Sequence, residues 1–275
     1  GGKISGWFSE FNFNQSQWTQ VKFVEETLGE KFPDMVFEAG GISHLFTTAT
    51  YQLGNSIAES YHRFGMDESI LNAYLEAWVA SGGAVEDLES AVPYLTGESG
   101  LTSITLTPYL KLRDGRCFYL GGSLSVNHRG EDKAVWGKFE EFPDQVAVLY
   151  QNGLSGLKKL CDRFIPHPWA CLTHVLKGFR ATIPVKEMKE CLDDFEMWYD
   201  PDDEEQTCRA IDVYNAVAAL VNELGAKNGP MRQSQNQELV ARLLVANWDE
   251  YDKKTPAKLF GKREDTAKEF DWLSL

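Results

Sequence analysis

The spacing of hydrophobic residues changes near the middle of the chain, and this change constrains the fold more than any other feature of the sequence. Between residues 104 and 112 hydrophobic and polar residues alternate, which is typical of a strand with one buried face. After Pro143 hydrophobic residues recur at the three- and four-residue intervals of helices. The sequence therefore predicts an α+β protein, with an antiparallel β-meander over about 101–140 and a mainly helical part after it.

A hairpin forms the first part of the predicted meander. The dipeptide Asp114-Gly115 separates the alternating residues 104–112 from a return strand over 116–126. It favours a two-residue turn, in which both central positions need positive φ. Pro108 has no N–H to donate, so its strand is expected at a sheet edge or with a bulge. A third strand is expected over 133–139.

The residues before the meander mix the two spacings. For residues 45–51 helix and strand are both open, because the helical stripe there is rich in Thr and aromatic residues, which favour strands. The most regular helix of this part starts at Asp67, because its apolar residues form one stripe at helical spacing: Ile70, Leu71, Tyr74, Leu75 and Trp78. The spacing predicts a strand over 7–14 and helices over 18–28, 43–64, 67–80 and 84–91.

The same change in spacing suggests how the chain is divided. We expect a first part over 1–143 and a second part over 144–275, packed either as two domains or as one unit. In the second part Asp200-Pro201 predicts a helix start, because aspartate caps well and proline fits the first helical position. Residues 225–233 predict a polar loop, and Ser234 with Gln237 a capping box for the last helix.

Charge excludes several classes of partner. The 275 residues include 41 acidic and 27 basic side chains, which gives a formal charge of −14. Proteins that bind nucleic acid in bulk present basic patches to the phosphates, so we expect no such binding, and no attraction to anionic membranes. No apolar run approaches the ~20 residues that a membrane helix needs. We expect the partner to be another protein, and the charge favours a basic one.

Cysteine usage bears on the compartment. An odd number of cysteines at wide spacing in apolar surroundings argues against a disulfide framework. We expect reduced thiols and a soluble protein of a reducing compartment, the cytoplasm. The five cysteines are Cys117, Cys161, Cys171, Cys191 and Cys208.

The sequence contains no nucleotide-binding loop, dinucleotide fingerprint, zinc-protease helix or serine elbow, and no cofactor is expected. The nearest approach to a site is Cys161, His167, Cys171 and His174, which could hold zinc in a tetrahedron. However, thiols and imidazoles alternate along the chain, and the usual pairing of like ligands is missing. We favour buried cysteines that pack as small hydrophobic residues. A metal site, or a thiol site of Cys171 with His174, is the alternative.

An acidic run is the second candidate, because residues 190–205 include nine acids and no base. Alternate acids in its last part resemble a calcium loop, but Glu205 replaces the required glycine and Ile211 replaces the bidentate glutamate. A capped helix start explains these residues more simply. The alternative is an acidic docking surface made by Asp200, Asp202, Asp203, Glu204 and Glu205.

Two classes of function remain open. The favoured one is a soluble intracellular binding or accessory protein without catalysis, which acts through protein–protein contacts. The alternative is an enzyme whose site is assembled by the fold, metal- or thiol-dependent, around Cys161, His167, Cys171 and His174.

Overall fold

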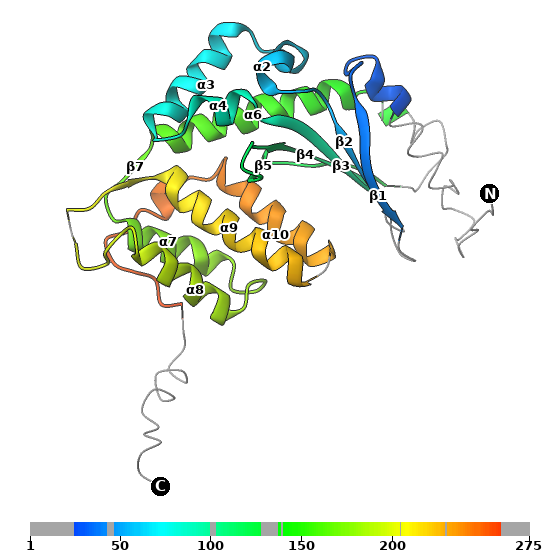
Figure 1. Cartoon of the computed structure of the whole chain (residues 1–275). Coiled ribbons are helices and arrows are strands. Elements are labelled where there is room, and N and C mark those ends of the chain that lie inside the picture. Colours follow the sequence, from blue (N-terminus) through cyan, green and yellow to red (C-terminus); the bar gives the residue numbers. More distant parts are fainter. Residues whose placement is uncertain are drawn as a thin grey trace. The chain divides into compact units, whose positions relative to one another are not determined.

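The fold combines an antiparallel sheet with helices. The chain divides into two compact units, residues 1–159 and 160–275. The first unit contains the sheet and the second is mainly helical, so the predicted α+β class is confirmed (Figure 1). The predicted division between residues 143 and 144 falls within the first turn of helix α6 (Phe142–Asp162). The computed structural model describes residues 25–42, 47–99, 103–127, 137–138, 140–203, 205–228 and 230–259.

The sheet of the first unit is antiparallel at every pairing, in the order β1-β2-β3-β4-β5, and β6 also pairs with β4. Cross-strand partners share a face, and the row Tyr51, Leu95 and Pro108 lies on the buried one. The strands are β1 (Val36–Ile42), β2 (Thr47–Gln52), β3 (Val92–Ser99), β4 (Ser103–Lys111), β5 (Cys117–Tyr119) and β6 (Leu124–Asn127).

The predicted hairpin joins β4 to β5, but its turn differs from the prediction. The N–H of Leu112 donates to the carbonyl of Arg116 at 2.8 Å, and the N–H of Gly115 donates to the carbonyl of Leu112 at 3.0 Å. The loop therefore has three residues, and Gly115 follows the turn with a φ of 89°. The predicted two-residue turn was wrong, because it requires a positive φ at Asp114 and Asp114 has none. The Asp114 carboxylate instead stabilises the observed turn by accepting a hydrogen bond from the N–H of Arg116 at 3.0 Å.

Pro108 lies in an interior strand and not at an edge. Its carbonyl accepts a hydrogen bond from the N–H of Leu120 at 3.3 Å, so the proline nitrogen faces the same neighbouring segment. That segment is interrupted there, since β5 ends at Tyr119 and β6 begins at Leu124. Pro108 therefore faces the interruption between β5 and β6, so its missing N–H removes no hydrogen bond from the sheet.

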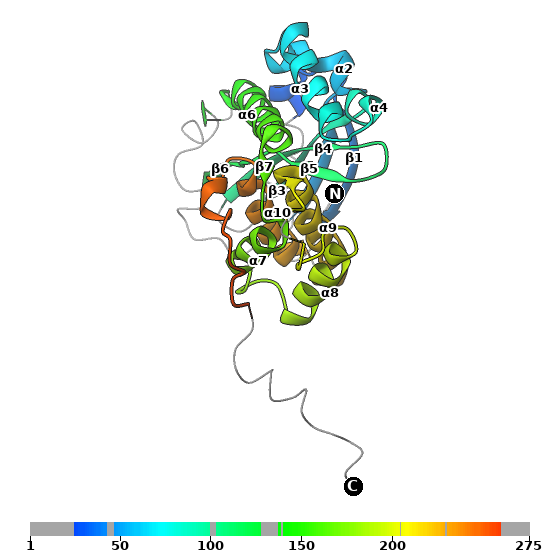
Figure 2. The same ribbon diagram turned by 90° about the vertical axis from the view of Figure 1, so that its left-hand side faces the viewer.

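Helices cover one face of this sheet (Figures 1 and 2). The helix predicted from Asp67 is confirmed as α3, and the Asp67 side chain caps it by accepting from the N–H of Ile70 at 2.9 Å. Trp78 of α3 contacts Phe118 of the sheet edge to face, with ring centroids 5.8 Å apart. The helical elements after β2 are α2 (Ile57–Ser60), the 3₁₀ turn η1 (Tyr61–Phe64), α3 (Glu68–Ala80), α4 (Val85–Glu89) and α6.

Several expected elements of the first unit need correction. The helix predicted over 43–64 is wrong in its first half, and the strand interpretation of 45–51 is confirmed by β2, where Ala49 and Tyr51 alternate with more exposed residues. The strand predicted over 7–14 lies outside the described residues, as does most of the helix predicted over 18–28, of which the described residues 25–28 are helical. The strand predicted over 133–139 also falls mainly outside them, and residues 137–138 are helical.

Helix α6 is continuous through Gly153. A Cβ atom at this position would lie 2.5 Å from the Cβ and 2.9 Å from the Cα of Leu120. The glycine therefore allows the helix to approach the segment between β5 and β6 closely, and it does not break the helix.

The second unit is a set of helices with a two-stranded ladder. The helix predicted from Asp200 begins ten residues later, at Ala210, and residues 225–228 continue it. The polar loop and the capping box were therefore wrong, because Pro230 starts the last helix and Ser234 lies inside it. The elements are β7 (Phe164–Ile165), α7 (Pro168–Gly178), α8 (Val185–Glu196), β8 (Cys208–Arg209), α9 (Ala210–Asn228), α10 (Pro230–Leu243) and the 3₁₀ turn η2 (Trp248–Glu250).

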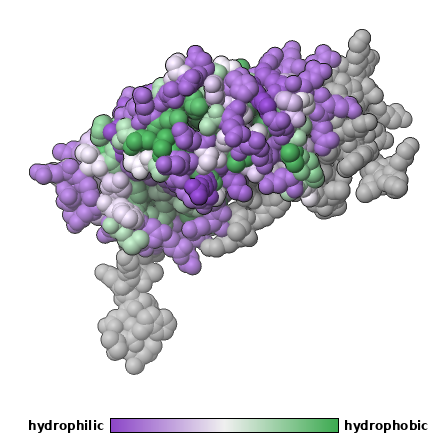
Figure 3. Space-filling view, turned by 45° about the horizontal axis from the view of Figure 1, so that its top comes forward, coloured by the Kyte–Doolittle hydropathy of each residue, from purple (hydrophilic) through white to green (hydrophobic). Residues whose placement is uncertain are grey.

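The molecular face in Figure 3 is mainly hydrophilic, with hydrophobic side chains gathered in small patches. Single exposed hydrophobic residues are normal on protein surfaces. Met197 and Trp198 differ because they are adjacent in sequence and each is 75% exposed. None of the helices in the described part of the chain has the length and apolar character needed to cross a membrane.

Candidate functional site: a groove between helices α8 and α9

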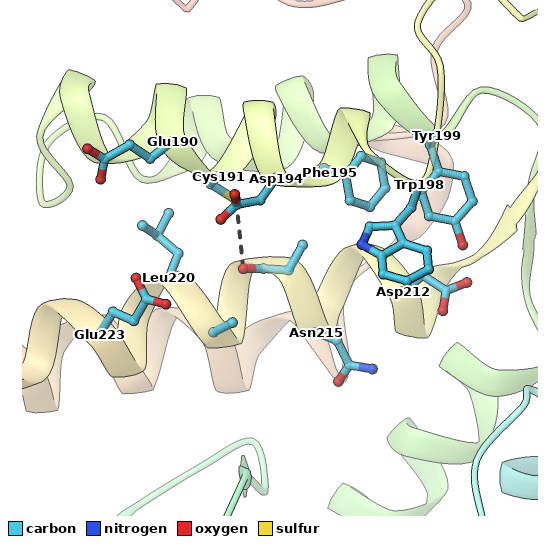
Figure 4. A pocket seen from close by; sticks show the side chains of 12 residues that line it. Glu190, Cys191, Asp194, Phe195, Trp198, Tyr199, Asp212, Asn215, Leu220 and Glu223 are labelled. Atoms are coloured by element: carbon cyan, nitrogen blue, oxygen red, sulfur yellow. Dashed lines mark hydrogen bonds between the residues drawn. The ribbon is translucent and has the colours of Figure 1, made fainter.

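A groove of about 370 Å³ lies between α8 and α9, within the second unit. Its floor is apolar and includes the buried side chains of Cys191, Phe195 and Leu220. The Cys191 thiol donates to the carbonyl of Ala216 at 3.7 Å and so joins the two helices across the floor (Figure 4). The remaining lining residues are Glu190, Asp194, Trp198, Tyr199, Asp212, Asn215, Ala219 and Glu223.

The sequence of each helix explains the shape of the groove. Helix α8 buries a stripe at helical spacing, made by Met188, Cys191, Leu192 and Phe195, and Pro184 precedes its first turn. Helix α9 presents small residues to the groove at Ala216 and Ala219. Short side chains on one wall leave the floor accessible between the helices.

The rim of the groove is acidic. Glu190 and Asp194 come from α8, Asp212 and Glu223 come from α9, and no lysine or arginine is among the lining residues. Glu190 forms an exposed i,i+4 pair with Lys186 at 3.4 Å, outside the groove lining. Burial, together with the charges of Asp194 and Glu223, raises the pKa of the Cys191 thiol to about 12. The thiol is therefore protonated at neutral pH and serves as part of the floor.

One end of the groove is aromatic. Figure 4 shows Trp198 and Tyr199, which follow the end of α8, gathered there with Asp212 and Asn215 from α9, whereas Glu190 and Glu223 lie at the other end. The Tyr199 ring packs against Phe195 with centroids 4.7 Å apart. Burial, and then the charge of Asp212, which also accepts a hydrogen bond from the hydroxyl, raise the pKa of Tyr199 well above its usual value.

The predicted acidic docking residues form a loop next to this aromatic end. Turns within the loop are closed by its own carboxylates: Asp200 accepts from the N–H of Asp202 at 2.8 Å, and Asp203 from that of Glu205 at 2.9 Å. The Gln206 amide joins the ends of the loop, accepting from the N–H of Asp200 at 2.6 Å and donating to the carbonyl of Trp198 at 2.9 Å. Asp200, Asp202, Asp203 and Glu205 are exposed, and Glu204 lies outside the described residues.

The loop explains why the predicted helix start was wrong. An aspartate at a helix N-cap would accept hydrogen bonds from the first helical N–H groups, but Asp200 and Asp203 use the same chemistry to close turns. The carboxylate that supports the first turn of α9 is Asp212, which accepts from the N–H of Arg209 at 2.8 Å.

The cysteines and histidines predicted as a candidate site do not form a cluster of metal ligands. Cys161 and Cys171 are buried in α6 and α7. His167 precedes α7, and the Nε2 atom of His174 lies 3.0 Å from the carbonyl oxygen of Thr255. No group of three or more His, Cys, Asp or Glu side chains that could hold a metal ion occurs among the residues that the structure describes.

The surroundings of Cys171 do not activate its thiol. Burial, followed by the charge of Asp252, raises the pKa of Cys171 to about 12, so this thiol is protonated at neutral pH. All five cysteines are free thiols, and Cys117 alone among them is not fully buried.

Sequence reasoning identified the acidic run but not the groove beside it. The signal was present in Met197-Trp198-Tyr199, three large apolar or aromatic residues within the acidic run and beyond the buried stripe of α8. Comparisons add no further guide, since no family model, curated protein or solved structure matches the chain.

Proposed function

We propose that this protein has no catalytic activity of its own and binds a basic segment of another protein in the groove between α8 and α9. The supporting observation is an apolar floor enclosed by Glu190, Asp194, Asp212 and Glu223, with no base in the lining. This combination suits a ligand that has an apolar stripe flanked by lysine or arginine.

An amphipathic helix is the ligand that fits the groove best. Glu190 of α8 and Trp198, two residues beyond the end of this helix, mark the two ends of the groove, and eight residues at helical rise span about 12 Å. Roughly two turns of a bound helix would span this length and place apolar residues at i and i+4 over the floor. The exposed Met197 and Trp198 lie beside it and are of the residue types that contribute most to protein interfaces.

The acidic loop extends the same surface. Asp200, Asp202, Asp203 and Glu205 are exposed and follow directly on Trp198 and Tyr199. Their charges would attract a basic partner before contact, which raises the association rate at low salt. The same charges oppose bulk binding of nucleic acid. The alternative enzyme around Cys161, His167, Cys171 and His174 gains no support from the placement of these residues.

A synthetic peptide tests the proposal. The probe, called the lysine peptide, is a fluorescent 14-residue amphipathic helix with leucine at i, i+4, i+7 and i+11 and lysine on both flanks. The control, called the glutamate peptide, has glutamate in place of each lysine. We expect the lysine peptide to bind, measured by fluorescence anisotropy, and to bind more weakly as salt is raised, because exposed charges are screened. The glutamate peptide should not bind.

A matched pair of variants locates the binding. The groove variant combines Glu190→Gln, Asp194→Asn and Glu223→Gln, and the control combines three acids of the first unit, Glu68→Gln, Glu76→Gln and Glu86→Gln. Both remove three negative charges, but only the first changes the groove. We expect about tenfold weaker binding for the groove variant and less than a twofold change for the control. Equal losses, or equal binding of both peptides, would show that net charge alone is sensed and would refute the proposal.

The loop needs a separate variant that keeps its turns. Asp200→Asn and Asp203→Asn retain a side-chain oxygen that can accept the hydrogen bonds from Asp202 and Glu205. Together with Glu205→Gln they should weaken binding of the lysine peptide two- to fivefold and reduce its dependence on salt. Unchanged affinity and unchanged salt dependence would limit the binding surface to the groove.

A further inference from the structure

The aromatic end of the groove has the geometry of a site for one cationic side chain. Resting on the proposed function, we infer that Trp198, Asp194, Asp212 and Asn215 together recognise a single arginine of the bound segment. Figure 4 shows the Trp198 indole extending from the turn after α8 toward α9, with Asp212 beside it, Asn215 about one turn further along α9, and Asp194 near the end of α8.

The Trp198 indole is exposed although its backbone is held in place. The backbone N–H of Trp198 donates to the carbonyl of Phe195 at 3.1 Å, and the backbone carbonyl of Trp198 accepts from the Gln206 amide at 2.9 Å. The side chain is nevertheless 75% exposed. The cation–π contacts within the described residues use Tyr94, Trp78 and Phe164, so none of these cations occupies the Trp198 ring. An exposed indole on a backbone that is held in place offers a cation the aromatic face that binds it best.

The carboxylate of Asp212 is positioned in advance. It accepts from the N–H of Arg209 at 2.8 Å and from the Tyr199 hydroxyl, and both donors belong to the body of the unit. Neither donor is a cation, because the Arg209 guanidinium lies over the Phe164 ring at 4.2 Å and donates to the carbonyl of Cys161. The Asp212 carboxylate therefore lines the groove in an orientation that hydrogen bonds hold.

Asp194 supplies a second negative charge on the opposite wall. It makes no ion pair with another described residue, and it lies close enough to Cys191 to raise the pKa of that thiol. A cation at this end of the groove can stack on the Trp198 indole and interact with the carboxylates of Asp194 and Asp212.

The arrangement favours arginine over lysine. A guanidinium group is planar, so it can stack on the indole while its N–H groups donate in its own plane to Asp212 and to the side-chain oxygen of Asn215. A lysine ammonium is compact and strongly hydrated, and it cannot stack and donate to a carboxylate in this fixed geometry. Discrimination between the two cations is therefore the property that distinguishes this site from a general acidic surface.

An arginine scan of the lysine peptide tests the inference. One arginine, or one citrulline, replaces lysine at each flank position in turn; citrulline has nearly the same shape as arginine but no charge. At one position we expect arginine to bind at least threefold more tightly than lysine and at least tenfold more tightly than citrulline. If no position prefers arginine over lysine, the inference is wrong.

Two neighbouring substitutions assign the preference to the indole. Trp198→Leu should reduce the arginine-to-lysine affinity ratio to about one, whereas Met197→Leu, at an equally exposed neighbour, should leave the ratio unchanged. The ratio is informative even where Trp198→Leu weakens all peptides by loss of apolar contact. A ratio that survives Trp198→Leu would refute the assignment.

The outcomes separate this inference from the proposed function. If lysine and arginine peptides bind equally and the groove variant weakens both, the protein binds basic segments but has no arginine site. If no basic peptide binds better than the glutamate peptide, the proposed function fails and the inference fails with it.

Discussion

A single hydroxyl group links helix α6 to the sheet of the first unit, and its removal should be measurable. The Tyr150 hydroxyl contacts the carbonyl oxygens of Tyr94 at 2.6 Å and of Tyr109 at 2.9 Å. Tyr94 and Tyr109 are register partners in β3 and β4. The substitution Tyr150→Phe removes this contact and retains the ring, which stacks on Phe64 with centroids 4.2 Å apart.

The expected loss of stability follows from burial. Tyr150 has no exposed surface, so water cannot replace the hydroxyl without a rearrangement of the core. A hydrogen bond contributes about 0.5–1.5 kcal/mol, and buried acceptors left without a partner raise the cost. We expect Tyr150→Phe to lower the free energy of unfolding by about 1–2 kcal/mol, equivalent to roughly 2–4 °C in Tm for each kcal/mol.

Urea unfolding followed by far-ultraviolet circular dichroism measures this change. The matched control is Tyr61→Phe in η1, a partly exposed residue, for which we expect a change within about 0.5 kcal/mol. The m value should be the same for both variants, because neither alters the surface exposed on unfolding. If Tyr150→Phe is as stable as the control, the hydroxyl does not hold α6 to the sheet and the reasoning is wrong.

Two further predictions concern stability in the second unit. Burial raises the pKa of Cys171 and of Cys191 from 9 to about 12. The unfolded state therefore loses these protons first, and the free energy of unfolding should fall as pH rises above 9; a constant urea midpoint between pH 8 and pH 10.5 would contradict this. The substitution Asp194→Asn should slightly raise the thermal midpoint and weaken binding of the lysine peptide. A loss of both stability and binding would argue that Asp194 has a structural role.

The sequence predicted elements best where local signals agree with each other. Helix α3 combines the cap of Asp67 with a regular apolar stripe, and its predicted bounds are close to the observed ones. Strand β1 was missed, because Ala39, Gly40 and Gly41 have weak strand preference and the strand depends on pairing with β2. The position of Gly153 inside α6 is explained by the close approach of Leu120, which leaves no room for a Cβ atom. Such contacts between distant residues leave no local signal.

The candidate site shows the same limit. The stripe of α8 could be read from its spacing, but spacing does not say which helix it will face or that Ala216 and Ala219 would leave a groove open there. The acidic run was visible, yet Asp200 and Asp203 were assigned to a helix because the same side chains cap helices and close turns. Which of these roles an aspartate takes depends on partners such as Gln206, which forms bonds to both ends of the loop.

The charges at the end of α8 support a role in binding because they do not favour the helix. Its last turn contains Asp193, Asp194 and Glu196 and no base, at the end where the helix dipole is negative. Acids in this position are each unfavourable by about 0.3–1 kcal/mol at low salt, and Glu190 adds a like charge one turn before Asp194. Sequences that fold well usually avoid such local conflicts, and those that persist are found most often at functional sites. A basic ligand in the groove would remove the conflict, so the rim that destabilises free α8 is the feature that would stabilise the complex.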